Sequence, residues 1–271
     1  METVLIVGIT GQDGAYLSHL LLEKGFHVVG TSRDASVCDT SRLRKIGVSE
    51  NVELTSLAPN DFRNVLKVIS TYKPSRIYNL SGQTSVGLSF DQPVECMESI
   101  AGSTLNFLEA LRFFDNEIKF FNAGSSECFG DTNKNKPADE EAPFCPRSPY
   151  AVAKSTAYWL VSNYRNSYNL FCCTGILSNH ESPLRANRFV TQKIIKHVRE
   201  IKNGQRKKLV LGNIDISRDW GWAPEYVKAM HLMLDSNNAN DYIISSGNTY
   251  SLKQFVNLTF NYFGLDADQY L

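Results

Sequence analysis

Near its amino terminus the chain reads Val4-Leu5-Ile6-Val7-Gly8-Ile9-Thr10-Gly11-Gln12-Asp13-Gly14, and the rest of the architecture can be worked out from this segment. Its first four residues are apolar and partly β-branched, which is typical of a buried strand. Glycines at positions 8, 11 and 14 allow a tight turn, a close approach of backbone N–H groups to a pyrophosphate, and close packing of the next helix on the strand. Apolar residues then recur with helical spacing from Tyr16 to Leu22. The segment therefore predicts a strand, a glycine turn and a helix that bind a dinucleotide.

A second strand is predicted at His27 to Thr31, and its end is where such folds carry the residue that reads the adenosine ribose. An acid there binds the free 2′-hydroxyl of NAD, whereas an arginine suits the 2′-phosphate of NADP. Arg33 indicates NADP, but Asp34 beside it leaves NAD open.

Strands and helices then alternate regularly. We expect strands at Val52 to Thr55, Arg76 to Leu80, Lys119 to Ala123 and Phe171 to Leu177, and helices at Asp61 to Tyr72 and Val94 to Phe114. Such alternation predicts an α/β fold with a doubly wound parallel sheet of the Rossmann type. Ligands bind at the carboxyl ends of the strands in these folds, so residues 80–84 should pass under the cofactor.

The regular alternation of strands and helices ends after residue 177. Irregular polar segments then connect a predicted helix at Phe189 to Ile201 with another at Leu252 to Phe263. We therefore predict a dinucleotide-binding domain over residues 1–177. Residues 178–271 should form mainly a smaller substrate-binding lobe, from which the chain crosses back to the sheet. Basic residues of this lobe are candidates for binding phosphates, namely Arg185, Lys193 and Arg218.

Two catalytic side chains are predicted in Ser148-Pro149-Tyr150-Ala151-Val152-Ala153-Lys154. Tyr150 and Lys154 lie four residues apart, which places them on one face of a helix that Pro149 starts well. A lysine ammonium beside a tyrosine hydroxyl favours the phenolate, and a phenolate can take a proton from an alcohol.

Two further candidates, Ser125 and Glu127, follow the strand that ends at Ala123. A hydroxyl at a strand end can hydrogen-bond a substrate oxygen, and the carboxylate two residues later lies on the same side of the chain. A polar loop from Asp131 to Pro146 leads from here to the helix with the tyrosine and the lysine. We expect the four side chains to meet above one edge of the sheet.

Composition narrows the classes of partner. The 271 residues carry 28 basic and 28 acidic side chains, so no overall field attracts nucleic acid or a membrane surface. The first apolar run begins almost at once and no later run is long enough to span a bilayer, so we expect a cytoplasmic protein. The six cysteines show no metal-ligand spacing with the five histidines, so we expect reduced cysteines and no metal site.

Three motifs together resemble the extended short-chain dehydrogenase/reductases that act on nucleotide sugars. They are the glycine pattern, Ser125-Ser126-Glu127 after the fifth strand, and the pair of Tyr150 and Lys154. Four strings narrow the resemblance to the GDP-mannose 4,6-dehydratase family over essentially the whole chain: Gly11-Gln12-Asp13-Gly14, Pro146-Arg147-Ser148-Pro149-Tyr150-Ala151-Val152-Ala153-Lys154, Asn179-His180-Glu181-Ser182-Pro183 and Arg218-Asp219-Trp220-Gly221.

The resemblance implies a lyase that converts GDP-mannose to GDP-4-keto-6-deoxymannose, with hydride moving from C4 to an NAD(P) cofactor and on to C6 while water is lost. Tyr150, assisted by Lys154, would take the proton of the 4-hydroxyl, and Ser125 would hydrogen-bond the 4-oxygen. Glu127 would remove the C5 proton and help water leave. Epimerases and 4-reductases on the same scaffold need only the tyrosine, the lysine and the hydroxyl, so the carboxylate decides the reaction type.

The resemblance also implies the binding residues and the assembly. The cofactor would contact Gly8, Thr10, Gly11, Gln12, Asp13, Gly14, Arg33, Ser36, Leu80, Ser81, Gly82, Gln83, Thr84, Tyr150, Lys154, His180 and Arg185. The GDP-sugar would contact Thr84, Ser85, Asn179, Glu181, Val190, Lys193, Gly212 and Arg218. A homodimer or homotetramer is implied, in which residues 33–43 cross to a neighbouring subunit.

The chain also departs from the family pattern. Ser125 replaces the usual threonine and keeps the hydroxyl, whereas Ala58-Pro59 and Asp34 replace residues that contact the cofactor, so NAD is an alternative to NADP. The chain ends sooner than family members generally do, which implies a truncated carboxyl terminus. The remaining alternatives are a nucleotide-sugar epimerase or 4-reductase, a dehydratase of another GDP-sugar such as a heptose, and a cofactor-binding protein without turnover.

Overall fold

The structure, a computed structural model, describes residues 1–114, 117–132 and 137–271. Part of the predicted loop from Asp131 to Pro146 lies outside these residues. The chain divides into two compact units, and each unit is built from two separate segments. The first unit contains residues 1–177 and 224–244, and the second contains residues 178–223 and 245–271.

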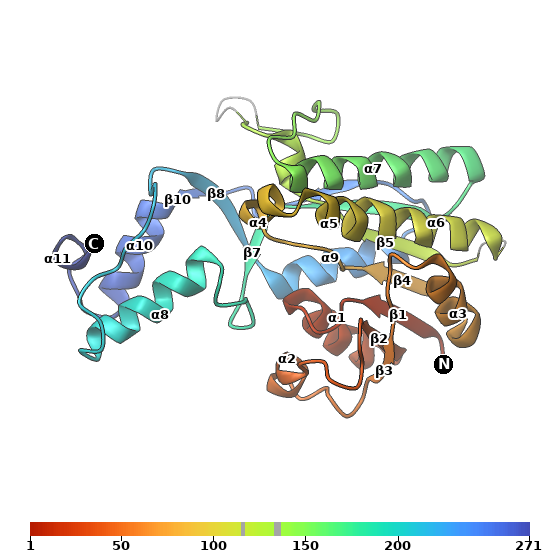
Figure 1. Cartoon of the computed structure of the whole chain (residues 1–271), viewed down its shortest axis with the longest axis horizontal. Helices are drawn as coiled ribbons and strands as arrows, with labels where there is room; N and C mark the ends of the chain where they lie inside the picture. The colour runs from red at the N-terminus through yellow and green to blue at the C-terminus, as the bar shows by residue number, and fades with distance from the viewer. Residues whose placement is uncertain (115–116, 133–136) are drawn as a thin grey trace. The chain divides into compact units, whose positions relative to one another are not determined.

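A seven-stranded parallel sheet forms the centre of the first unit, which confirms the predicted fold class (Figure 1). Its strands, in spatial order, are β3 (Glu53–Ser56), β2 (His27–Ser32), β1 (Thr3–Val7), β4 (Arg76–Asn79), β5 (Lys119–Ala123), β6 (Cys172–Leu177) and β9 (Tyr242–Ile244). The order reverses between β1 and β4, so a crevice for ligands is expected at the carboxyl ends of these two strands.

Helices cover both faces of this sheet (Figure 1). One face carries α3 (Phe62–Tyr72), α6 (Ser103–Phe113) and α7 (Pro149–Tyr168), and the other carries α1 (Gln12–Glu23) and α9 (Ala223–Asp235). The short helix α2 (Ser41–Lys45) follows β2. One core cluster lies between the sheet and the first set of helices, where fully buried side chains such as Leu5, Ile77, Phe107, Phe120 and Val161 pack together. The alternating apolar runs of the sequence thus bury both faces of a parallel sheet.

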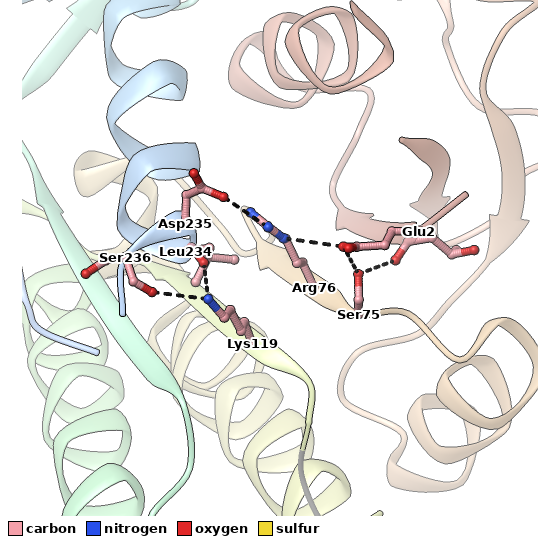
Figure 2. Close-up of polar contacts among 8 residues, drawn as sticks. Glu2, Ser75, Arg76, Lys119, Leu234, Asp235 and Ser236 are labelled. Atoms are coloured by element: carbon pink, nitrogen blue, oxygen red, sulfur yellow. Dashed lines mark hydrogen bonds and ion pairs between the residues drawn. The ribbon is translucent and has the colours of Figure 1, made fainter. Parts of the chain in front are cut away.

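Two basic residues fasten α9 to the amino-terminal edge of the sheet (Figure 2). Arg76 Nη2 lies 3.1 Å from Asp235 Oδ1. Lys119 Nζ donates to the carbonyl oxygens of Leu234 (2.8 Å) and Ser236 (3.1 Å). Carbonyl groups at the end of a helix lack partners within the helix, and here a lysine satisfies two of them.

The prediction of one helix from Val94 to Phe114 is wrong in detail. Helix α5 (Pro93–Met97) leads into a π-helical turn, η1 (Glu98–Gly102), and only then into α6. Ser103 Oγ donates to the Ser99 carbonyl oxygen (2.7 Å), so a side-chain hydroxyl adds a hydrogen bond to a carbonyl of this wider turn. A further short helix, α4 (Val86–Asp91), was not predicted, and neither was β9.

The other predicted strands and helices of the first unit are confirmed to within a residue or two, except that α1 begins at Gln12, four residues before the predicted pattern and within the glycine string. The fourth predicted strand is one residue too long, because β4 ends at Asn79 and Leu80 begins the following loop. The predicted strand at Val52 to Thr55 is observed one residue later, as β3.

The second unit has its own small sheet and core. Its three-stranded sheet has the order β10 (Thr249–Ser251), β8 (Ser217–Trp222), β7 (Asn179–Glu181). Its helices are α8 (Val190–Lys202), α10 (Leu252–Tyr262) and the short α11 (Ala267–Tyr270), and the first two confirm the predicted helices. Ile194, Val198, Leu209, Val256 and Phe260 are central to its core. None of the helices in the described ranges is both long and apolar enough to cross a membrane.

Candidate active site

The glycine turn is tightly packed, because Gly8 and Gly14 lie very close to neighbouring backbone atoms. Gly8 has a φ of +88°, a left-handed conformation that favours glycine. A Cβ added to Gly14 would lie 2.6 Å from the Gly8 carbonyl oxygen. A Cβ added to Gly8 would lie 3.3 Å from the backbone of Leu80. The turn therefore brings the amino terminus of α1 and the loop after β4 together, as a dinucleotide site requires.

The segment after β2 forms a local turn around Asp34. Its Oδ1 accepts hydrogen bonds from the Ser36 backbone N–H (2.9 Å) and from the Ser36 hydroxyl (2.6 Å). These bonds lower the pKa of the Asp34 carboxyl. Arg33 is exposed beside it. Arg42, which the sequence analysis did not select, donates from Nη1 to the Thr10 carbonyl oxygen (3.0 Å), so α2 packs on the glycine turn.

The loop of residues 80–84 is held from both of its sides. Ser81 Oγ donates to Asn79 Oδ1 (2.7 Å), and the Gln83 backbone N–H donates to Ser99 Oγ in the π turn (3.2 Å). Gln83 Oε1 accepts from the Ser85 backbone N–H (2.6 Å). The loop thus has a defined conformation next to the glycine turn.

The carboxyl end of β5 presents the first two candidate catalytic residues. Ser125 is buried, and its Oγ accepts from the Glu127 backbone N–H at 3.3 Å. This bond caps a short 3₁₀ helix, η2 (Ser126–Phe129), on which the half-buried Glu127 lies. The serine therefore fixes the backbone that carries the carboxylate.

Helix α7 carries the other two candidate catalytic residues, Tyr150 and Lys154. Ser148 Oγ caps this helix by accepting from the Ala151 backbone N–H (3.1 Å). Lys154 Nζ lies 5.9 Å from the centroid of the Tyr150 ring and donates to the Ala123 carbonyl oxygen (2.6 Å). Lys154 is only 6% exposed, and burial lowers its pKa to about 8.

These contacts place three of the four candidate catalytic residues, Ser125, Tyr150 and Lys154, around the carboxyl end of β5. Lys154 and Tyr150 share one face of α7, as predicted, and the lysine reaches the carbonyl group two residues before Ser125. The spacing of the motif could not reveal this acceptor, because it depends on how α7 packs over β5. Glu127 follows on the 3₁₀ turn that Ser125 caps.

The remaining predicted residues lie in the second unit and fall into two groups. Around β7, His180 Nδ1 lies 2.8 Å from the Ser178 carbonyl oxygen, and Glu181 Oε1 lies 3.5 Å from Arg185 Nε. The Arg185 guanidinium also lies 3.7 Å from the centroid of the Phe189 ring. Asn179 lies on β7 beside them, and Val190 begins α8.

The second group lies on α8 and on the segments that follow it. Lys193 Nζ donates to the Val210 carbonyl oxygen (3.1 Å), two residues before the exposed Gly212. Arg218 lies on β8, where its Nη1 donates to the Ser217 carbonyl oxygen (2.9 Å). Asp219, to which the sequence analysis gave no role, accepts from the backbone N–H groups of residues 246 and 247 and so holds the turn before β10.

Metal-ligating side chains do not gather in the described residues: no group of three or more His, Cys, Asp or Glu side chains there could hold a metal ion. The six cysteines are free thiols.

Comparison with known proteins gives the family. A family model described as GDP-mannose 4,6 dehydratase matches residues 5–270. The chain belongs to this family. It is 44% identical to GDP-mannose 4,6 dehydratase 1 of Arabidopsis thaliana over 275 residues, which cover 98% of this chain and 76% of the relative. It is 42% identical to GDP-mannose 4,6 dehydratase of Homo sapiens over 271 residues, with coverage of 97% and 73%. Membership in the GDP-mannose 4,6-dehydratase family confirms the prediction of a hydro-lyase of the nucleotide-sugar dehydratase class.

Solved structures of more distant proteins share the fold. The dTDP-glucose 4,6-dehydratase of Bacillus anthracis in complex with NAD matches with a TM-score of 0.87 at 19% identity, covering 100% of this chain and 84% of that one. The UDP-glucose 4-epimerase of Thermus thermophilus in complex with NAD matches with a TM-score of 0.85 at 22% identity, covering 97% and 84%. Dehydratases and epimerases therefore share this architecture, and the family assignment rests on the closer sequence relatives.

Proposed function

We propose that this chain converts GDP-mannose to GDP-4-keto-6-deoxymannose with the loss of one water molecule. Its membership in the GDP-mannose 4,6-dehydratase family supports the reaction and the substrate. The observation that carries the proposal is the arrangement of Tyr150, Lys154 and Ser125 around the end of β5, with Glu127 on the turn that Ser125 caps.

A dinucleotide fits the first unit, because the glycines let its pyrophosphate come close to the backbone at the start of α1, where the N-cap residue Gly11 makes no side-chain cap hydrogen bond. When bound, the dinucleotide supplies an acceptor for a hydride and then returns that hydride within the same reaction. The residues proposed to hold it are Gly8, Thr10, Gly11, Gln12, Asp13, Gly14, Arg33, Ser36, Leu80, Ser81, Gly82, Gln83, Thr84, Tyr150, Lys154, His180 and Arg185.

We propose NADP as the preferred dinucleotide. The exposed Arg33 can pair with a 2′-phosphate, whereas the Asp34 carboxylate is occupied by hydrogen bonds from Ser36. Titration of the purified protein with NADP and with NAD, followed by quenching of tryptophan fluorescence, compares the two. Tighter binding of NAD would contradict the preference while leaving the reaction proposal intact.

Tyr150 is proposed to take the proton of the sugar 4-hydroxyl at its phenolate oxygen. Lys154 favours this phenolate through its positive charge, and its hydrogen bond to the Ala123 carbonyl oxygen keeps the ammonium at the end of β5. The Ser125 hydroxyl lies two residues further along the chain and is proposed to hydrogen-bond the 4-oxygen.

Glu127 is proposed to perform the elimination. A 4-ketone makes the neighbouring C5 proton acidic, so the carboxylate can remove it while the C6 hydroxyl leaves. The carboxyl group then returns a proton to the departing oxygen, which leaves as water, and the carboxylate is regenerated. The hydride that ends at C6 is matched by one proton that C5 takes up, and the Tyr150 hydroxyl gives up one proton, so both side chains return to their starting states. The half-buried position on a capped 3₁₀ turn holds this group near the end of β5.

The second unit is proposed to bind the GDP part of the substrate. Arg218 and Lys193 offer positive charges for its phosphates. The net charge of the chain is zero, so the positive charge that attracts the phosphates must come from such local side chains. The other residues proposed to contact the GDP-sugar are Thr84, Ser85, Asn179, Glu181, Val190 and Gly212.

The test is mass spectrometry of GDP-mannose incubated with the protein and NADP. We expect the product to have lost one water, and the Glu127→Gln variant to be slower by about 100-fold or more, the usual effect of a general acid–base group. Glu50→Gln, at an exposed loop position, is the matched control and should keep full activity. A sugar of unchanged mass with altered stereochemistry would instead indicate an epimerase, and would refute the proposal.

We also propose a homodimer or homotetramer. Large apolar side chains of the first unit are exposed on neighbouring helices, with Phe90 on α4 and Trp159 on α7 both 61% exposed and Val94 on α5 68% exposed. Exposed large apolar side chains on neighbouring helices commonly mark an interface. Light scattering during size-exclusion chromatography measures the mass, and a monomer would contradict the proposal. The cytoplasmic location stays a prediction from the sequence.

A further inference from the structure

Three buried polar side chains from three different elements meet beneath the proposed dinucleotide loop. They are Asn79 at the end of β4, Asn122 near the end of β5 and Thr104 on α6, and each is at most 3% exposed. Asn79 Nδ2 donates to Asn122 Oδ1 (3.2 Å) and to Thr104 Oγ1 (3.4 Å). Thr104 Oγ1 lies 3.2 Å from Asn122 Oδ1. We name these three residues the amide cluster.

The amide cluster holds the loop through Asn79. Asn79 Oδ1 accepts from both the hydroxyl (2.7 Å) and the backbone N–H (3.4 Å) of Ser81. With its oxygen turned to the loop, the Asn79 amide must turn its nitrogen towards Asn122 and Thr104. One side chain therefore connects residues 80–84 to the interior of the sheet.

Thr104 joins the same cluster to the π turn. Its Oγ1 lies 2.7 Å from the Ile100 carbonyl oxygen, inside η1. The π turn in turn supports the loop, because Ser99 Oγ accepts from the Gln83 N–H (3.2 Å). A Cβ added to Gly82 would lie 2.8 Å from Ile100 Cγ1, so the loop packs directly on this turn.

Asn122 extends the cluster towards the lysine. It is the register partner of Asn79 in the parallel sheet, and the next residue is Ala123, whose carbonyl oxygen accepts from Lys154 Nζ. The amide cluster thus links the loop on one strand end to the acceptor of the lysine on the next.

Stability alone gives a poor account of this cluster. Burying an amide costs free energy that a hydrogen bond only offsets, and Asn122 Nδ2 is buried without a hydrogen-bond partner among the described residues. An apolar side chain at this position would avoid that cost.

We propose that Asn79, Thr104 and Asn122 are positioning residues, which fix the 80–84 loop and the end of β5 relative to one another through one shared set of hydrogen bonds. The proposal rests on the proposed function, in which the loop holds the dinucleotide and Tyr150 and Lys154 act on the sugar. The dinucleotide and the catalytic side chains must act at the same carbon atom of the sugar, so small errors in their relative alignment reduce turnover.

Thr104→Val tests this, because it keeps the shape of the side chain and removes only the shared hydroxyl. Thr174→Val is the matched control: Thr174 is the register partner of Asn122 on β6, is fully buried, and its hydroxyl has no hydrogen-bond partner in the described part of the chain. Thr104→Ser restores the hydroxyl.

For Thr104→Val we expect kcat to fall about tenfold, the effect of losing one hydrogen bond, while KM for GDP-mannose stays within about twofold. Amide hydrogen exchange of Ser81 and Gln83 should become about tenfold faster. Thr104→Ser should recover both values, and Thr174→Val should change neither. If Thr104→Val behaves as Thr174→Val does, the proposal is overturned.

The two proposals fail in distinguishable ways. If the parent protein does not dehydrate GDP-mannose, the proposed function fails, and the exchange comparison still decides whether the amide cluster fixes the loop. If the parent is active and both kcat and KM of Thr104→Val change in proportion to its loss of thermal stability, the cluster is purely structural and the positioning role is refuted.

Discussion

Replacing Lys154 by methionine should reveal how much burial of the lysine ammonium group lowers the stability of the folded protein. The side chain is 6% exposed and contacts the Ala123 carbonyl oxygen. Methionine has a similar length and an apolar body, so the variant removes the titratable group with little change in packing.

The magnitude follows from the pKa of the lysine, which burial lowers from 10.5 to about 8. At about 1.4 kcal/mol for each pH unit, the charged form is destabilised by about 3 kcal/mol in the folded state. The sign follows from proton binding: between about pH 8 and 10.5 the unfolded chain holds this proton and the folded chain has released it, so the free energy of unfolding rises with pH. The parent should therefore gain about 2 kcal/mol relative to Lys154→Met between about pH 7 and about pH 9.5.

Urea denaturation followed by tryptophan fluorescence measures both proteins across this range, and the difference between them cancels the other titrating groups. Lys67→Met, at an exposed position on α3, is the control and should show no such trend. A difference that stays flat, or falls as the pH rises, would refute the reasoning, because it would mean that the buried ammonium is at least as well stabilised as it is in water.

Two further substitutions test the glycine turn and the edge of the sheet. Gly14→Ala places a Cβ 2.6 Å from the Gly8 carbonyl oxygen, so we expect a loss of about 1–3 kcal/mol in stability and weaker dinucleotide binding, measured by urea denaturation and fluorescence titration. Gly87→Ala, with nothing within 4 Å of the added Cβ, should have neither effect. Asp241→Ala removes the partner of the largely buried Arg165, whose Nη2 lies 2.5 Å from the carboxylate, and should cost about 3 kcal/mol. A loss below about 1 kcal/mol in the same denaturation assay would show that water replaces the carboxylate.

The long elements of the first unit were predictable because each carries its own signal. Apolar runs bounded by glycine or proline marked β1, β2 and β5, and periodic apolar residues marked α3. Strand β9 has only three residues and is defined by pairing with β6, from which it is separated by the segment 178–241. No local pattern reports such a pairing, so the sequence analysis missed it.

The candidate site shows the same division between local and distant causes. The spacing of Tyr150 and Lys154 on a helix is local, and it was predicted. The acceptor of Lys154 and the amide cluster depend on how α6 and α7 pack over the sheet. The sequence offered one signal for the amide cluster. Two neighbouring buried strands each carry an asparagine near their carboxyl end, Asn79 and Asn122, where apolar residues would otherwise be expected.

The interleaving of the two units has a consequence for biosynthesis. The first unit includes residues 224–244, which carry most of α9 and all of β9, and they follow 46 residues of the second unit along the chain, 178–223. During translation the edge of the large sheet must therefore stay open, with β6 unpaired on one side, until the ribosome has made the first segment of the other unit. An exposed strand edge invites pairing with other chains, so the nascent protein passes through a stage that needs protection from aggregation.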